Sequence, residues 1–129
     1  MSHLGGGIAA LLGRVRSYQD KDFWGTADNA RHGKTPERDF DHYLRHNVMF
    51  DTAGFCGAMG AVRGALIEIP ASRIVFATDY PQAIRDPGEV KDYVEAVEVL
   101  DPNANALVHG LNAEKLIPNI KERVAKRKK

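Results

Sequence analysis

Two residues of this 129-residue chain stand where α/β folds carry out chemistry, His3 and Asp79. His3 precedes three glycines and an apolar helix, which is typical of the sharp turn that delivers a side chain after a strand. Asp79 follows the strand-like run Ile74–Thr78, where a carboxylate is costly to desolvate unless a cation or hydrogen bonds compensate. We expect His3 to be either a solvated terminal residue or part of a larger structure. Asp79 is expected to be either a metal ligand or proton acceptor, or the cap of the turn before Pro81.

The elements that must position these residues form a β-α-β unit. Asn47–Thr52 and Ile74–Thr78 are short, nearly continuous apolar runs, which indicates strands of a parallel sheet buried on both faces. Gly57–Ile69 between them has the apolar spacing of a helix. Because the carboxyl ends of parallel strands carry chemistry, Asp51 and Thr52 mark a third candidate position beside His3 and Asp79.

The remaining periodicity predicts further helices and one polar loop. The sequence Asp86-Pro87-Gly88-Glu89 is a helix start, and Asn112 is expected to cap the last helix after a shorter one ends at Gly110. The other predicted segments are a helix over Ile8–Tyr18, a polar loop over Gln19–Lys34, a helix from Thr35-Pro36 through Arg45, a short helix over Asn103–His109, and a last helix carrying Leu116, Ile117, Ile120 and Val124.

Several other patterns are weaker indications of a site. His42 and His46 have the i, i+4 spacing of a metal pair, but both point away from the apolar stripe of their helix and are expected to be solvated. His32 and His109 are not preferred ligands, and Cys56 is expected to pack rather than react. The glycine run fits a dinucleotide fingerprint only formally, because no full strand precedes it. An esterase is excluded, because no G-x-S-x-G nucleophile elbow occurs.

Composition places the chain among globular proteins, with 43% hydrophobic and 27% charged residues. Basic residues gather in positions 121–129 without interleaved aromatic residues, so we expect a solubilising helix end and no nucleic-acid partner. No run approaches the roughly 18 apolar residues of a membrane span, and no signal peptide is recognisable. A cytoplasmic protein with no membrane partner is therefore expected, and the single cysteine agrees with a reducing compartment.

Four motifs, taken in order, carry a resemblance to a known family. Ser2-His3-Leu4-Gly5-Gly6, Phe50-Asp51-Thr52-Ala53-Gly54, Arg73 to Pro81 (RIVFATDYP) and Gly110 to Leu116 (GLNAEKL) follow one another at the spacing of the amidohydrolase-related family. These "amidohydrolase 2" proteins include the aminocarboxymuconate-semialdehyde and resorcylate type decarboxylases. The resemblance covers the whole chain but only the C-terminal part of a family member.

The resemblance implies an α/β fold, a distorted (β/α)₈ barrel that binds one divalent metal, usually zinc. Positions 1–129 would be a C-terminal fragment of one such barrel domain, with a stub of the sixth strand and strands seven and eight. Asp79, after the eighth strand, would be a metal ligand and proton shuttle. His3, after the sixth, would be the catalytic histidine, and Arg14 would hold a substrate carboxylate.

By this resemblance the chain is part of a metal-dependent hydrolase or carboxy-lyase (decarboxylase) acting on a small carboxylate-bearing substrate. A whole barrel needs about 250 residues, and the N-terminal His-x-His pair of the family is absent here. The chain alone is therefore expected to be inactive and to bind metal weakly or not at all. Unpaired strand edges would favour a homo-oligomer or a partner that supplies the missing barrel half. The alternatives are a non-catalytic remnant that acts through such association and, more distantly, a nucleotide-binding module that uses the triple glycine.

Overall fold

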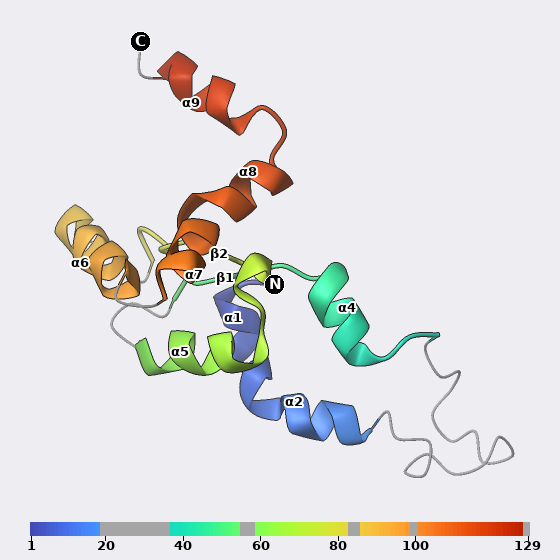
Figure 1. Ribbon diagram of the computed structural model, residues 1–129. Coiled ribbons are helices and arrows are strands. Elements are labelled where there is room, and N and C mark those ends of the chain that lie inside the picture. Colours follow the sequence, from blue (N-terminus) through green and yellow to red (C-terminus); the bar gives the residue numbers. More distant parts are fainter. Residues whose placement is uncertain (19–36, 55–58, 83–85, 99–100, 128–129) are drawn as a thin grey trace, which may run out of the picture.

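The computed structural model describes residues 1–18, 37–54, 59–82, 86–98 and 101–127 (Figure 1). Most of the described residues are helical, around one small sheet. The elements are α1 (His3–Gly6), α2 (Ile8–Ser17), α4 (Phe40–His46), β1 (Phe50–Asp51), α5 (Met59–Glu68), the 3₁₀ turn η1 (Ala71–Arg73), β2 (Ile74–Val75), α6 (Pro87–Glu98), α7 (Pro102–Ala106), the π-helical segment η2 (Leu107–Leu111), α8 (Asn112–Leu116) and α9 (Ile120–Arg127).

The sheet consists of β1 and β2, which pair in parallel with α5 between them in the chain. Phe50 lies opposite Ile74 and Asp51 opposite Val75, which confirms the predicted β-α-β order. The regular strands are shorter than the predicted runs because a side chain replaces the backbone pairing at the next position. The Ala77 N–H and carbonyl, which face β1, bond to the Thr52 hydroxyl at 3.0 and 2.9 Å.

The residue at the start of the chain extends this sheet on the other side of β1. The Met1 amino group donates to the Met49 carbonyl at 2.7 Å, and the Asp51 N–H donates to the Met1 carbonyl at 3.2 Å. This pair of bonds is the pattern that sets Met1 opposite Phe50 in a parallel ladder. Only Met1 of the expected stub before His3 thus pairs with β1, on the side opposite β2, and the regular sheet of the described residues consists of β1 and β2.

The outer edge of β2 is closed by the C-terminal helices, so the expectation of an open edge is wrong for this part of the sheet. Asn112 was expected to cap a helix, but α7, η2 and α8 run on through Gly110 and bury Asn112 to 2% exposure. Its Nδ2 donates to the carbonyls of Ala71 and Ile74, both at 2.8 Å. With the bond from Phe76 to Val108, these contacts satisfy the side of β2 that faces away from β1.

Two helix starts also differ from the predictions. The helix α4 begins at Phe40 because the Asp39 carboxylate caps it, accepting from the His42 N–H at 2.6 Å. The predicted start at Thr35-Pro36 lies outside the described residues. The last helix divides because Ile117 takes an extended conformation before Pro118, so α9 begins anew at Ile120.

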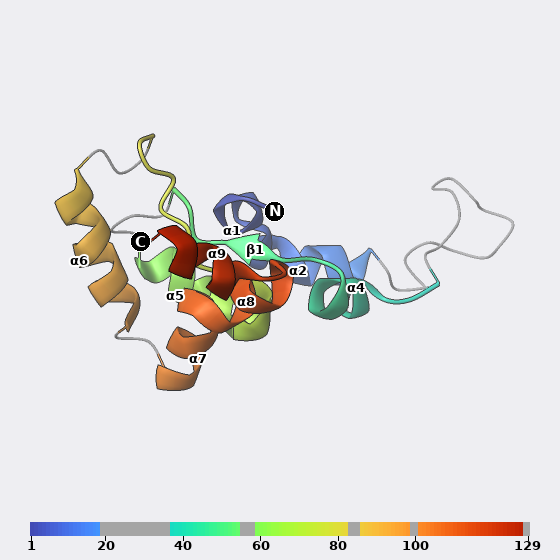
Figure 2. The ribbon, with the colours of Figure 1, turned by 90° about the horizontal axis from the view of Figure 1, so that it is seen from above.

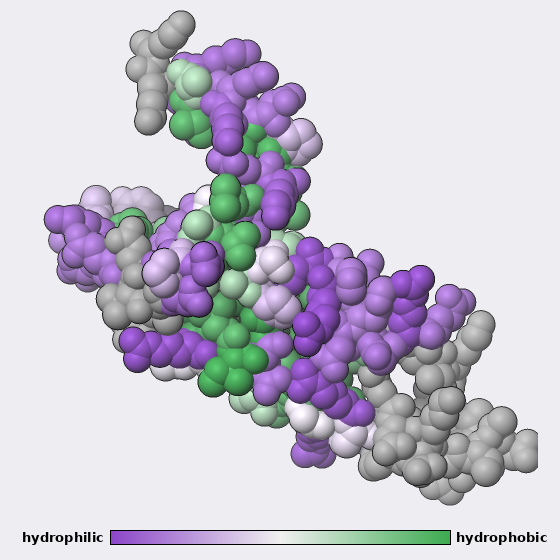
Figure 3. All heavy atoms as spheres, in the orientation of Figure 1, coloured by the Kyte–Doolittle hydropathy of each residue, from purple (hydrophilic) through white to green (hydrophobic). Residues whose placement is uncertain are grey.

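The core is apolar and joins residues of β1 and β2 to residues of the helices that surround them. Figure 2 shows β1 from above with helices around it. In Figure 1 α9 projects from the body beyond α8, and none of its side chains is buried. Figure 3 shows apolar surface over the middle of the molecule and hydrophilic surface over α9. No helix in the described ranges is both long and apolar enough for a membrane crossing. The buried core residues are Leu4, Leu12, Leu44, Phe50, Val62, Ala65, Ile69, Ile74, Tyr93 and Val108.

An ion-pair network ties α2, α4 and α5 together on the outside of this core. The Arg16 guanidinium donates to both carboxylate oxygens of Asp41, at 2.9 and 2.8 Å, and to Glu68 at 2.8 Å. These hydrogen bonds raise the pKa of Arg16 above its usual range and, from the same pairing, lower the pKa of Asp41. The side chains keep about a third of their exposure, so water screens the attraction.

Candidate functional site

His3 begins a left-handed turn that ends where α2 starts. The φ angles of His3 and Leu4 are 54° and 49°, and Gly5, Gly6 and Gly7 continue at 70°, 63° and 87°. Non-glycine residues adopt this conformation at a cost, so surrounding contacts must hold it. Leu4 is buried in the core, and a Cβ on Gly5 would lie 2.9 Å from the Phe50 ring. The expected sharp turn is thus present, and the first of its glycines packs against β1.

The imidazole of His3 is held over the loop that follows β1. Its Nδ1 lies 2.9 Å from the Ala53 carbonyl oxygen. A carbonyl oxygen only accepts hydrogen bonds, so Nδ1 carries the proton of the neutral ring and Nε2 keeps the lone pair. Nε2 is therefore the nitrogen at which His3 gains or gives a proton.

Asp51, the last residue of β1, fixes the backbone beneath that imidazole. Its Oδ1 accepts from the His3 N–H at 2.9 Å and from the Ala53 N–H at 3.1 Å. One carboxylate oxygen thus joins two segments that are far apart in the sequence. The sequence marked Asp51 as a strand-end position without giving it a role; the signal was an acid in the last strand position before a short Ala-Gly turn.

Asp79 follows β2 at the same end of the sheet. The extended chain continues beside β1 beyond β2, because the Thr52 hydroxyl donates to the Ala77 carbonyl at 2.9 Å and accepts from the Ala77 N–H at 3.0 Å. Asp79 then takes a left-handed φ of 60°, and its backbone carbonyl accepts from the Gln82 N–H at 2.7 Å. The chain reaches this turn from the carboxyl end of β2, as the sequence predicted.

The turn after β2 is capped by Thr78, whereas the sequence pattern allowed Asp79 this role. The Thr78 hydroxyl oxygen accepts from the Tyr80 N–H at 3.1 Å. The half-buried Asp79 carboxylate accepts no hydrogen bond from any residue of the described ranges. Within the described residues the Asp79 side chain therefore does not cap this turn, and its role as a metal ligand or proton acceptor stays a prediction.

His3 and Asp79 follow the two parallel neighbours of β1. With strands about 4.8 Å apart, two spacings separate the two outer segments by roughly 10 Å across the sheet. The topology therefore places both at one end of the sheet, on either side of β1.

A metal ion would need more ligands than this arrangement supplies. In the part of the chain that the structure describes, no three histidine, cysteine, aspartate or glutamate side chains are grouped closely enough to hold one. A catalytic zinc typically has three protein ligands. The described residues thus do not fit a resident metal by themselves, and Asp79 contributes one ligand at most.

The His42 and His46 rings stack on each other, with centroids 4.3 Å apart. His42 Nε2 lies 2.8 Å from an Arg38 guanidinium nitrogen, and His46 Nδ1 lies 2.8 Å from the His42 carbonyl oxygen. Partial desolvation, the Arg38 charge and the neighbouring His46 lower the pKa of His42. Both hydrogen bonds lie at the exposed surface, which agrees with the expectation that these histidines face solvent, and their contacts are not those of a metal pair.

Arg14 lies on the exposed side of α2, where its Nε and Nη2 donate to the Tyr18 hydroxyl at 3.3 and 3.2 Å. Its guanidinium also lies 5.8 Å from the centre of the Tyr18 ring. Arg14 is thus engaged along its own helix. The predictions for His32 and Cys56 concern residues outside the described ranges.

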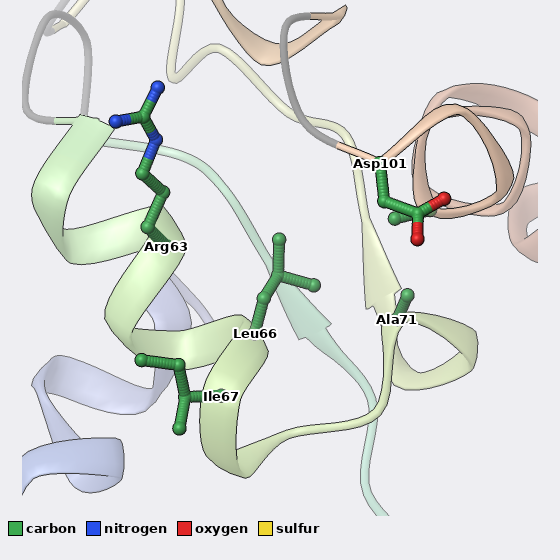
Figure 4. Close-up of a pocket in the computed structure, with 6 residues that line it drawn as sticks. Arg63, Leu66, Ile67, Ala71 and Asp101 are labelled. Atoms are coloured by element: carbon green, nitrogen blue, oxygen red, sulfur yellow. The ribbon is translucent and has the colours of Figure 1, made fainter.

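A separate hollow of about 360 Å³ lies between α5 and the region of α7 (Figure 4). Arg63 and Asp101 stand on opposite sides of it, with Leu66, Ile67 and Ala71 along the wall. Because Ala71 precedes β2, this hollow is on the amino side of that strand, away from the end that carries Asp79. It is not part of the candidate site.

Comparison with known proteins gives a fold but no sequence family. No protein-family model and no curated protein sequence matches the chain. Among solved structures, 2,6-dihydroxybenzoate decarboxylase from Rhizobium matches with a TM-score of 0.66 and 23% identity, over 89% of this chain and 32% of that one. Dihydroxybenzoic acid decarboxylase from Polaromonas sp. JS666, with bound manganese and 2-nitroresorcinol, matches with the same values.

The 5-carboxyvanillate decarboxylase from Novosphingobium aromaticivorans, complexed with manganese and a nitrobenzoic acid, has a TM-score of 0.68 and 22% identity, over 88% of this chain and 31% of that one. The chain thus spans about a third of the length of the solved structures that it matches. Those structures are TIM-barrel decarboxylases. This chain therefore shares the fold of about one third of these TIM barrels.

Proposed function

We propose that this chain forms the C-terminal third of a metal-dependent carboxy-lyase barrel, with its catalytic residues at the carboxyl ends of the Met1 stub, β1 and β2. The observation that carries the proposal is the parallel order of these three segments, which puts His3 and Asp79 on either side of β1 at one end of the sheet. The matched structures are decarboxylases, and the match covers nearly the whole of this chain.

In this proposal His3 carries the proton. A carboxy-lyase replaces a carboxylate with a proton on carbon, so the site needs a group that gains and gives a proton near neutral pH. The Nδ1 bond to Ala53 leaves Nε2 of His3 for this task. Arg14 would hold a substrate carboxylate only if its guanidinium left the Tyr18 hydroxyl.

Asp79 would supply one ligand to a divalent metal, and the remaining ligands would have to come from the rest of a complete barrel. The resemblance favours zinc, whereas two of the matched structures contain manganese. Oxygen ligands suit manganese, and both metals accept a carboxylate. The isolated chain would then be inactive, because it lacks the remaining ligands and the walls of the substrate pocket. A hydrolase of the same barrel type is the second outcome that the site chemistry allows.

A fusion tests this function. The N-terminal two thirds of the Rhizobium 2,6-dihydroxybenzoate decarboxylase, ending before the matched segment, would be joined to this chain and assayed with manganese for release of CO₂ from 2,6-dihydroxybenzoate. We expect activity in the fusion and a loss of about 100-fold or more in His3→Ala and in Asp79→Asn. His46→Ala is the matched control and should keep full activity. A folded fusion whose activity is indifferent to His3 and Asp79 would refute the proposal.

A further inference from the structure

The two residues that flank the turn after β1 both contact His3, one at its backbone and the other at its ring. Asp51 holds the His3 backbone and Gly54 lies directly against the His3 ring. We propose that Asp51 and Gly54 are positioning residues that fix the neutral His3 imidazole as the Nδ1-protonated tautomer and direct Nε2 to the carboxyl end of the sheet. The assignment rests on the proposed function only in treating His3 as the proton carrier.

The Asp51 contribution is made by a single oxygen atom. Oδ1 accepts both the His3 N–H and the Ala53 N–H, and Ala53 is the residue whose carbonyl meets His3 Nδ1. This oxygen therefore sets the distance between the backbone of His3 and the acceptor of its ring. An asparagine amide oxygen at this position can accept the same two bonds, so the need is for an acceptor rather than for a charge.

Gly54 contributes by leaving room for the His3 ring. Gly54 has a φ of 73°, and a Cβ built on it would overlap His3 Nδ1 and come within 3.0 Å of Cε1. Any larger residue would push the ring off the Ala53 carbonyl. Gly6 is the natural comparison, because its φ of 63° is similar but a Cβ there meets nothing within 4 Å.

This arrangement gives the two ring nitrogens of His3 different roles, because Nδ1 is hydrogen-bonded to Ala53 and Nε2 is left to accept a proton. While Nδ1 donates to the Ala53 carbonyl, the neutral ring can accept a proton only at Nε2. Without the Asp51 hydrogen bonds and the close contact with Gly54, either ring nitrogen of His3 can carry the proton and the ring can rotate. A site that delivers a proton in one direction needs the arrangement in which Nδ1 is fixed and Nε2 carries the exchanged proton.

Long-range ¹H–¹⁵N correlation of the histidine rings in the full chain, near pH 8.5, reads the tautomer of His3 directly and requires no metal or substrate. We expect His3 to be mainly Nδ1-protonated. Asp51→Ala and Gly54→Ala should each lower that population several-fold, whereas Asp51→Asn and Gly6→Ala should retain it. His46, whose Nδ1 lies against the His42 carbonyl, is the internal reference.

Backbone amide spectra of each variant show whether it is folded, and the comparison is made between folded variants, with the wild-type tautomer as a separate test that can overturn the inference. A wild-type His3 that is mainly Nε2-protonated would overturn the inference, as would an unchanged tautomer in folded Asp51→Ala and Gly54→Ala. Because the readout involves no turnover, its failure would leave the proposed function standing. An inactive fusion with the expected tautomer would instead refute the function alone.

Discussion

Thr52 and Ala77 are joined by two hydrogen bonds through one hydroxyl group, which donates to the Ala77 carbonyl at 2.9 Å and accepts from the Ala77 N–H at 3.0 Å. This link continues the contact between the two strands past the end of their regular ladder, toward Asp79. The Tyr93 hydroxyl of α6 donates to the Thr52 carbonyl at 2.9 Å and so fixes the same residue from the helix side. The position of Asp79 therefore depends on a buried threonine.

Replacing Thr52 by valine should destabilise the fold, although the two side chains have nearly the same shape. Thr52→Val leaves the N–H and carbonyl of Ala77 without their partner in a buried place, which costs about 1–3 kcal/mol of unfolding free energy. Urea unfolding followed by circular dichroism measures the change. Ser72→Ala, at an exposed position, is the control and should stay within about 0.5 kcal/mol. A Thr52→Val variant as stable as the control would show that the link contributes nothing.

Removal of the Asn112 amide should open the outer edge of β2. Asn112→Ala loses the two bonds to the carbonyls of Ala71 and Ile74, so we expect a loss of about 2–3 kcal/mol and an increased tendency to self-associate. Urea unfolding and sedimentation velocity measure the two effects. The exposed Asn103→Ala should change neither. If Asn112→Ala sediments as the wild type does and unfolds at the same urea concentration, the edge is not protected by this residue.

The Arg16 network should make stability depend on pH in one direction. Because pairing lowers the pKa of Asp41 in the folded protein, its contribution is fully present above the unfolded value of about 4 and is lost as pH falls toward the lowered folded value. Asp41→Asn should cost about 1 kcal/mol or less at pH 7, since the pair is a third exposed.

Thermal unfolding at pH 7 and at pH 3 measures this difference between wild type and Asp41→Asn. The gap between the two proteins should shrink at pH 3 and also in 1 M salt. Glu95→Gln removes the exposed partner of Lys91 and serves as the control, with no resolvable effect at either pH. A gap that widens on acidification would contradict the sign of the Asp41 contribution.

Local patterns predicted the β-α-β unit because its strands lie in nearly continuous apolar runs and α5 has a regular apolar spacing. They failed at Asn112, where asparagine before a helical run looks like a cap. The π-helical segment Leu107–Leu111 instead carries the helix past Gly110 and turns Asn112 inward. The bonds that decide this outcome reach residues about 40 positions away, so no local pattern reveals them.

The candidate site likewise has one feature that the sequence predicted and others that it did not. Glycines after His3 predicted a sharp turn, and the turn is there with left-handed φ angles. The contacts of Asp51 and Gly54 with His3 were not predictable, because they depend on the pairing of Met1 beside β1. Whether Asp79 binds metal depends on ligands that the described residues do not include.

Metal affinity of the fusion with the N-terminal two thirds of the Rhizobium decarboxylase tests the central claim most directly. Calorimetric titration with Mn²⁺, and separately with Zn²⁺, should show one tight equivalent in the fusion and only weak binding in the isolated chain. Asp79→Asn should weaken the tight site by about 100-fold or more, and His42→Ala, at a stacked histidine with its own partner, should leave it unchanged. Tight stoichiometric binding that survives Asp79→Asn, or that the isolated chain already shows, would contradict the account.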